Sequence, residues 1–155
     1  MTGLMVVQAL HVLAGVIWAG GQVVMGVAVL PALLGMPPRE ARTLLDALGA
    51  RVGPLMALSG MAVMVLGIVR GTVYGPVRSL TVLLETPYGW TFSAALALAV
   101  VGAVHGSRSE ARLAGLFDGE RFHPSAGRRL FADAAFVVSL VVGLVGCMVA
   151  MHFGL

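Results

Sequence analysis

The chain of 155 residues is 59% hydrophobic and only 11% charged, with a mean hydropathy of +0.97. A soluble domain carries roughly 25% charged residues, so this composition excludes a solvated globular surface, and it excludes intrinsic disorder as well. The net charge of +3 comes from ten arginines and no lysine. We therefore expect an integral membrane protein in a lipid bilayer, with a single domain over residues 1–155 and no nucleic-acid partner.

Charged residues divide the chain into four long uncharged blocks. Asp, Glu and Arg are absent from 1–38, 52–69, 86–107 and 134–155. A helix needs ~20 apolar residues to cross a bilayer, and lipid forces the backbone to satisfy its own hydrogen bonds. The sequence predicts an all-α protein with spans near 4–30, 52–70, 88–105 and 132–153.

The arginines predict the orientation of these spans. The second connection holds only Arg70 and Arg78, whereas the first and third connections together hold eight arginines: Arg39, Arg42, Arg51, Arg108, Arg112, Arg121, Arg128 and Arg129. By the positive-inside rule, the first and third connections face the cytoplasm and both termini lie outside. Four spans with short connections favour an up-down-up-down four-helix bundle in the inner (plasma) membrane.

Two connections carry local signals. Pro37–Pro38 mark the start of a helix, and the apolar residues Leu44, Leu45 and Leu48 follow among charged ones. This pattern predicts an amphipathic helix over about 38–49 at the membrane interface. The third connection, 106–131, is polar, and we expect a loop with a single helical turn.

One face of the first span carries polar and small residues. His11 lies about 10 Å below the outer boundary of the membrane, at ~1.5 Å per residue along the predicted span. The helical face that contains it comprises His11, Gly15, Trp18 and Gln22. If this face pointed to lipid, its hydrogen-bonding groups would have no partners, so we expect it to contact protein or a cofactor. Gly15 would allow a helix or a flat cofactor to approach closely. These four residues are the candidate cofactor-binding residues.

Imidazole and thioether donors lie at similar depth in the outer half of the predicted bundle. The second span places Met64 at the level of His11, and the fourth span places Met148 and His152 on one face. These side chains are ligands for copper(I) and for haem iron. The candidate metal ligands are therefore His11, Met64, Met148 and His152.

The fourth span also has a small-residue face, which leaves an alternative open. Small faces usually mark helix contacts, and this one lies roughly opposite Met148 and His152; it comprises Ser139, Gly143, Gly146 and Ala150. If it alone points inward, Met148 and His152 face lipid or another subunit, as in a homodimer. His105, at the inner end of the third span, either belongs to a second site or holds a loop in place.

The first span resembles the opening helix of the copper-resistance CopD family. The resemblance rests on His11, Trp18 and the Gly20–Gly21 pair, followed by Pro31. The later segments Arg51–Pro54, Ser59–Gly60 and Thr86–Pro87–Tyr88–Gly89 are similar to segments of that family. The resemblance implies copper binding or transport, with His11 as the binding residue.

A similar first helix occurs in the HemJ protoporphyrinogen oxidases. That resemblance implies an association with haem. The alternative hypothesis is therefore a b-type haem protein with His11 as one axial ligand and Met148 or His152 as the other, acting as an electron carrier or a haem-dependent oxidoreductase. The family's arginine after the exit proline is replaced by Ala32, and the chain has no hydrolase or nucleotide-binding motif. The favoured hypothesis is therefore a copper-binding membrane protein, ahead of a haem protein and of a structural subunit without a cofactor.

Overall fold

Helices make up almost the whole of the computed structural model, which describes residues 2–154. Four helices are long and apolar enough to cross a membrane, and they cover Thr2–Leu33, Pro38–Thr72, Pro87–Ser107 and Ala126–His152. Each of the four predicted spans overlaps one of these helices. The prediction of an all-α protein with four apolar helices suited to a membrane bundle is confirmed.

The first long helix continues beyond its predicted end because it widens ahead of a proline. It consists of α1 (Thr2–Val24), the π-helical segment η1 (Met25–Val29) and α2 (Leu30–Leu33). Pro31 has no N–H to donate, and its ring crowds the carbonyl one turn earlier. A π-helical turn accommodates such an interruption without ending the helix. The helix therefore ends at Leu33 instead of residue 30.

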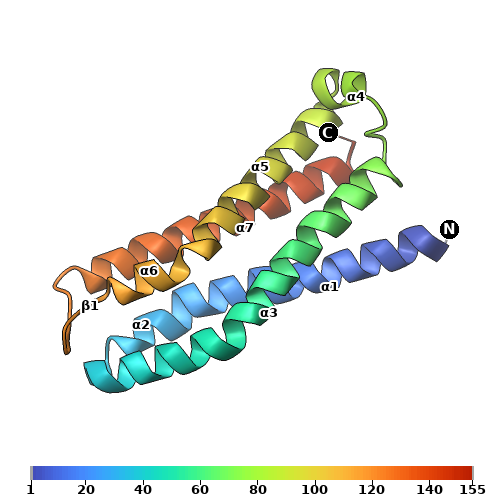
Figure 1. Ribbon diagram of the computed structural model, residues 1–155. Helices are drawn as coiled ribbons and strands as arrows, with labels where there is room; N and C mark the ends of the chain where they lie inside the picture. The colour runs from blue at the N-terminus through green and yellow to red at the C-terminus, as the bar shows by residue number, and fades with distance from the viewer. Residues whose placement is uncertain (1, 155) are drawn as a thin grey trace.

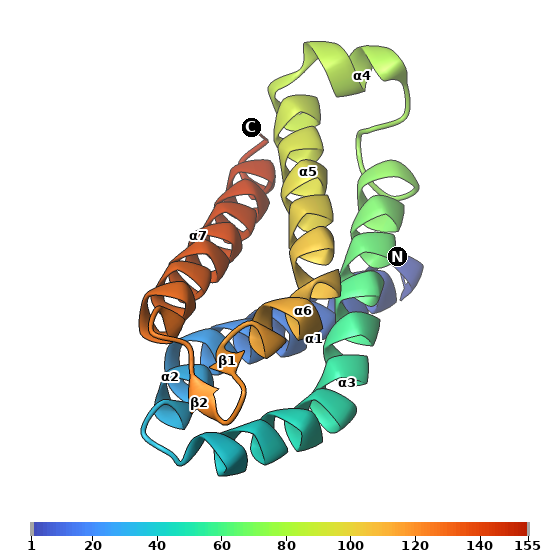
Figure 2. The ribbon, with the colours of Figure 1, turned by 60° about the vertical axis from the view of Figure 1, so that its left-hand side comes forward.

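The second long helix, α3 (Pro38–Thr72), combines two elements that the sequence analysis separates. The predicted interfacial helix over 38–49 is amphipathic, since Ala41 and Leu45 are buried while its charged residues are exposed. It runs without a break into the membrane span. A helix of 35 residues is about 52 Å long, well beyond ~30 Å of hydrocarbon. Pro54 lies inside α3, and Figure 2 shows the helix bending in this region.

The second half of the chain contains the other two long helices and four short elements. The long helices are α5 (Pro87–Ser107) and α7 (Ala126–His152), and the unpredicted α4 (Leu80–Glu85) precedes α5. The connection expected to be a loop with one helical turn instead forms α6 (Ser109–Ala114) and a hairpin of β1 (Phe117–Asp118) and β2 (Arg121–Phe122).

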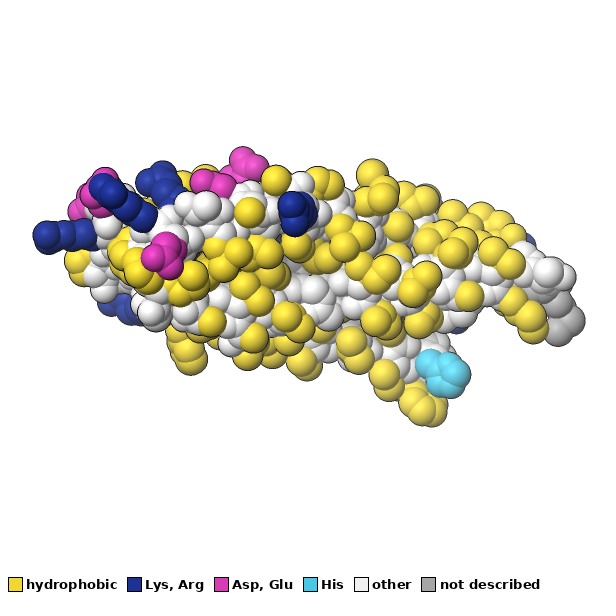
Figure 3. Space-filling view, turned by 90° about the horizontal axis from the view of Figure 1, so that it is seen from below, with side chains coloured by type: hydrophobic (Ala, Val, Ile, Leu, Met, Phe, Trp, Pro, Cys, Tyr) yellow, Lys and Arg dark blue, Asp and Glu magenta, His cyan; other side chains and the backbone are white. Residues whose placement is uncertain are grey.

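The long helices associate as two pairs, α1 with α3 and α5 with α7. Figure 1 shows both chain ends and α4 at one end of the molecule, and α2 and β1 at the other. At the α2 end, a buried apolar cluster joins the two pairs and comprises Leu30, Leu33, Ala41, Leu45, Leu116, Ala126 and Leu130. Hydrophobic side chains cover most of the surface seen in Figure 3, and most charged groups there gather toward one end.

Candidate functional site

The polar face of α1 packs directly on glycines of α3. A Cβ atom at Gly67 would lie 3.1 Å from Cε1 of His11, and a Cβ atom at Gly60 would lie 2.9 Å from Cδ1 and Nε1 of Trp18. Both side chains therefore fill hollows that exist because α3 has glycine at these positions.

The contact between α1 and α3, called the seam below, also contains the reverse arrangement, in which side chains of α3 pack on glycines of α1. A Cβ atom at Gly15 would lie 4.0 Å from Val63, and one at Gly21 would lie 2.6 Å from Sδ of Met56. Residue numbers rise along α1 as they fall along α3, so the contacts keep one antiparallel register. This register is set by the alternation of large and small residues on both helices.

Trp18 also reaches the second helical pair. A Cβ atom at Gly102 of α5 would lie 3.3 Å from Cζ2 and Cη2 of Trp18. The indole ring is therefore enclosed by Gly60 on one helix and Gly102 on the other. It connects the α1–α3 pair to α5 near the middle of the molecule.

His11 lies between α1 and α3 with its ring close to the main chain of Val63. Its Nδ1 atom is buried and has no partner among residues 2–154. The main chain of Val63 and the guanidinium group of Arg70 are the polar groups that act on the ring. Arg70 itself donates a hydrogen bond from Nε to Oε1 of Gln8. The surroundings of His11 therefore carry a positive charge.

The other candidate residues lie in different parts of the fold. Gln22 and Met64 line a cavity between the helical pairs. Met148 and His152 are exposed on α7, and the edge of the His152 ring contacts Phe153. The structure thus brings Trp18, Gln22 and Met64 to the cavity, but it does not gather Met148 and His152 with His11. In the described part of the chain, no three His, Cys, Asp or Glu side chains are placed to share a metal ion.

The cavity between the helical pairs has a volume of about 970 Å³. Side chains from α1, α3, α5, α6 and α7 line it, and most of them are apolar. Ligand pockets in proteins are typically about 300–1,000 Å³ and combine apolar walls with a few convergent polar groups. This cavity has the size and the lining of a small-molecule site.

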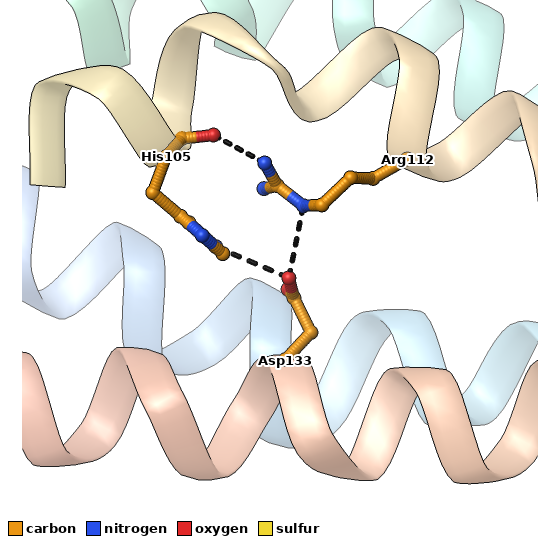
Figure 4. A network of polar contacts seen from close by, with 3 residues as sticks. All are labelled: His105, Arg112 and Asp133. Carbon is orange, nitrogen blue, oxygen red and sulfur yellow. Dashed lines mark hydrogen bonds and ion pairs between the residues drawn. The ribbon is translucent and has the colours of Figure 1, made fainter. Parts of the chain in front are cut away.

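Three polar side chains form a network at one end of the cavity (Figure 4). Nε of Arg112 donates a hydrogen bond to Oδ1 of Asp133 over 3.0 Å, and Nη1 of Arg112 donates to the carbonyl oxygen of His105. Nε2 of His105 lies 3.1 Å from the same Oδ1 atom, in a direction that does not complete a hydrogen bond. The network ties the end of α5 to α6 and α7.

A second arginine, Arg129, is exposed on α7 and lines the same end of the cavity. Nη1 of Arg129 donates a hydrogen bond to the carbonyl oxygen of Gly115 over 2.7 Å. Arg129 forms no ion pair with a carboxylate in residues 2–154, whereas the charge of Arg112 is matched by that of Asp133. With His105 neutral, this end of the cavity carries a net positive charge.

Sequence reasoning left the role of His105 open and did not identify the network. The structure shows that Arg112 fastens the segment following α5, through hydrogen bonds to the main-chain carbonyl of His105 and to Asp133, and that the His105 ring lies beside this carboxylate. A signal was present in the sequence, because His105 and Asp133 border the third and fourth predicted spans on the same side. Their partner Arg112 lies in the connection between those spans.

Comparisons with family models, with curated proteins and with solved structures found no match to this chain. The similarity of its first span to the CopD and HemJ families therefore rests on the short motifs alone.

Proposed function

We propose that this chain is a multi-pass protein of the inner (plasma) membrane that binds a small, largely apolar molecule in the cavity between its helical pairs. The observation that carries the proposal is the cavity of about 970 Å³ with apolar walls and a polar cluster at one end. A space of this size lies within the range of ligand sites in proteins, roughly 300–1,000 Å³, and its apolar lining suits a molecule that dissolves in the bilayer.

The proposed orientation is an up-down-up-down bundle with both termini outside. It is supported by the two arginine-rich connections, because the first follows α2, the third contains β1, and α2 and β1 lie at the same end of the molecule in Figure 1. In a Cys147→Ser background, a membrane-impermeant maleimide applied to intact cells should label Thr81→Cys and leave Asp118→Cys unlabelled. The reverse labelling pattern would invert the orientation.

Binding in the cavity can be measured through Trp18. The chain has two tryptophans, and the Trp90→Phe variant retains only Trp18, which lines the cavity. In lipid nanodiscs, dibromostearyl alcohol should quench Trp18 fluorescence with a saturable dependence on its mole fraction. A quencher that only dissolves in the surrounding lipid would give a dependence without saturation.

Filling the cavity should abolish this saturable quenching. Ala57 and Ala103 line the cavity from α3 and α5, so the variant with Ala57→Phe and Ala103→Phe should bind the alcohol at least about tenfold more weakly. The matched control is Leu58→Phe with Val104→Phe, which changes the adjacent exposed residues outside the lining. Equal quenching curves for the two double variants would contradict the proposal.

Metal binding at His11 is the second candidate function, and the buried, unpartnered Nδ1 atom of its ring favours it. Copper(I) or haem b would bind there only with donors other than Met148 and His152, which lie on the exposed face of α7. Two features oppose it: the positive charge of Arg70 acts on the ring, and Gly67 holds the ring against α3.

A visible spectrum and elemental analysis of the purified protein test this second candidate. If His11 binds haem or copper, His11→Ala should abolish the Soret band or the stoichiometric copper, and His152→Ala should leave either unchanged. A wild-type protein without colour and without copper would eliminate it.

A further inference from the structure

The charged end of the cavity indicates the chemical class of the occupant. We infer that the cavity binds an amphipathic anion, with a carboxylate or phosphate head group held by Arg129 beside the Arg112–Asp133 pair and an apolar chain along the cavity walls. This inference depends on the proposed function and adds the identity of the head group.

The first argument is the balance of charge. Asp133 is the only acidic side chain that lines the cavity within residues 2–154, and it is already engaged by Arg112. Arg129 has no such partner, and the bond to the Gly115 carbonyl uses one of its five N–H donors. An anionic head group would bring the cluster close to neutrality, whereas a cationic one would add to the positive charge.

The second argument is the geometry of the guanidinium group. Its planar array of donors matches the oxygens of a carboxylate or a phosphate, and such bidentate pairs are roughly twice as strong as neutral hydrogen bonds. Arg129 keeps donors on both Nε and Nη2 for this purpose.

The third argument is the distribution of polarity along the cavity. On α7 the lining runs from Arg129 and Asp133 to Leu144, and the eleven residues after Asp133 correspond to about 16 Å. Away from the charged end, the walls include the flexible side chains of Met61 and Met64, which adapt to apolar partners of varied shape. One charged end and one long apolar wall match a molecule with a head group and a hydrocarbon chain.

The position of the charged end agrees with this class of molecule. The polar network joins the end of α5 to α6, next to the arginine-rich third connection. In the proposed orientation this level is the cytoplasmic interface, where head groups of membrane amphiphiles lie. A lipid-dissolved anion could therefore occupy the cavity with its head group remaining at the interface.

The test compares three compounds that share one dibrominated C18 chain and end in a carboxylate, a monophosphate or a hydroxyl group. Their saturable quenching of Trp18 is measured at pH 8 in Trp90→Phe nanodiscs. The better-bound anion should bind at least about tenfold more tightly than the alcohol, and its identity distinguishes a carboxylate from a phosphate head group. Arg129→Gln should remove most of this advantage without changing binding of the alcohol, and Arg129→Lys should retain part of it.

Arg128→Gln is the matched control, because Arg128 is exposed like Arg129 on the same turn of α7 but does not line the cavity. It should bind all three compounds as the parent does. The inference is overturned if the alcohol binds as tightly as both anions, or if Arg129→Gln weakens all three compounds equally. If none of the three quenches saturably, the proposed function itself fails, so the two failures are distinguishable.

Discussion

Gly60→Val is expected to lower the free energy of unfolding by about 3 kcal/mol, which corresponds to a fall in Tm of about 6–12 °C. The added Cβ alone would lie 2.9 Å from the indole ring of Trp18. The ring has little room to retreat, because Gly102 of α5 lies on another side of it. The cost of overpacking therefore exceeds the small gain in helix propensity on replacing glycine. Thermal unfolding followed by circular dichroism measures the effect.

Gly20→Val is the matched control for this prediction. Gly20 lies in α1, and a Cβ atom built there meets no other atom within 4 Å. The same substitution should therefore change Tm only slightly. Trp18→Leu should restore part of the stability lost in Gly60→Val, because it removes the ring that the valine strikes. Equal Tm values for Gly60→Val and Gly20→Val would show that the seam is not packed as described.

Asp133→Ala is expected to cost about 2 kcal/mol of unfolding free energy. The substitution removes the acceptor of the 3.0 Å hydrogen bond from Arg112 and the carboxylate that faces His105. Breaking a fully buried pair costs about 3–5 kcal/mol. The Asp133 side chain is 22% exposed, so water replaces part of the lost interaction and the expected cost is smaller. The corresponding fall in Tm is about 4–8 °C.

Asp118→Ala is the control, because Asp118 is exposed on β1 and forms no ion pair with the residues that the structure describes. Its Tm should stay close to that of the wild type. Asp133→Asn keeps an oxygen that can accept from Arg112 but loses the charge, so its Tm should be intermediate. If Asp133→Ala unfolds at the same temperature as Asp118→Ala, the network does not stabilise this end of the bundle.

The number and position of the long helices could be predicted because lipid imposes strict local rules. A membrane span must be apolar and helical over ~20 residues, so gaps between charged residues are sufficient to locate it. The same rules do not locate helix ends precisely. The first helix passes through Pro31 by widening into η1, so its predicted end at residue 30 was too early. The predicted interfacial helix over 38–49 and the predicted span over 52–70 form one continuous helix, α3.

The candidate site was less predictable from sequence. A shared helical face groups His11, Gly15, Trp18 and Gln22 in the sequence, but it cannot reveal which helix covers that face. The face is covered by α3, because Gly60 and Gly67 are separated by the same number of residues as His11 and Trp18 and so receive Trp18 and His11 respectively. The cavity and its charged end depended on residues from five helices, which no local pattern relates.

The amino-acid sequence by itself determined that this chain is a helical membrane protein with four apolar segments and arginines concentrated in two connections. Each of these properties follows from transfer of individual residues between water and lipid, so it is readable residue by residue. The tertiary structure alone decided that His11 lies in a packed seam, that Arg112 and Asp133 meet, and that the two helical pairs enclose a cavity. These features depend on the register between distant segments, which is set by the mutual fit of side chains and not by the polarity of any one of them.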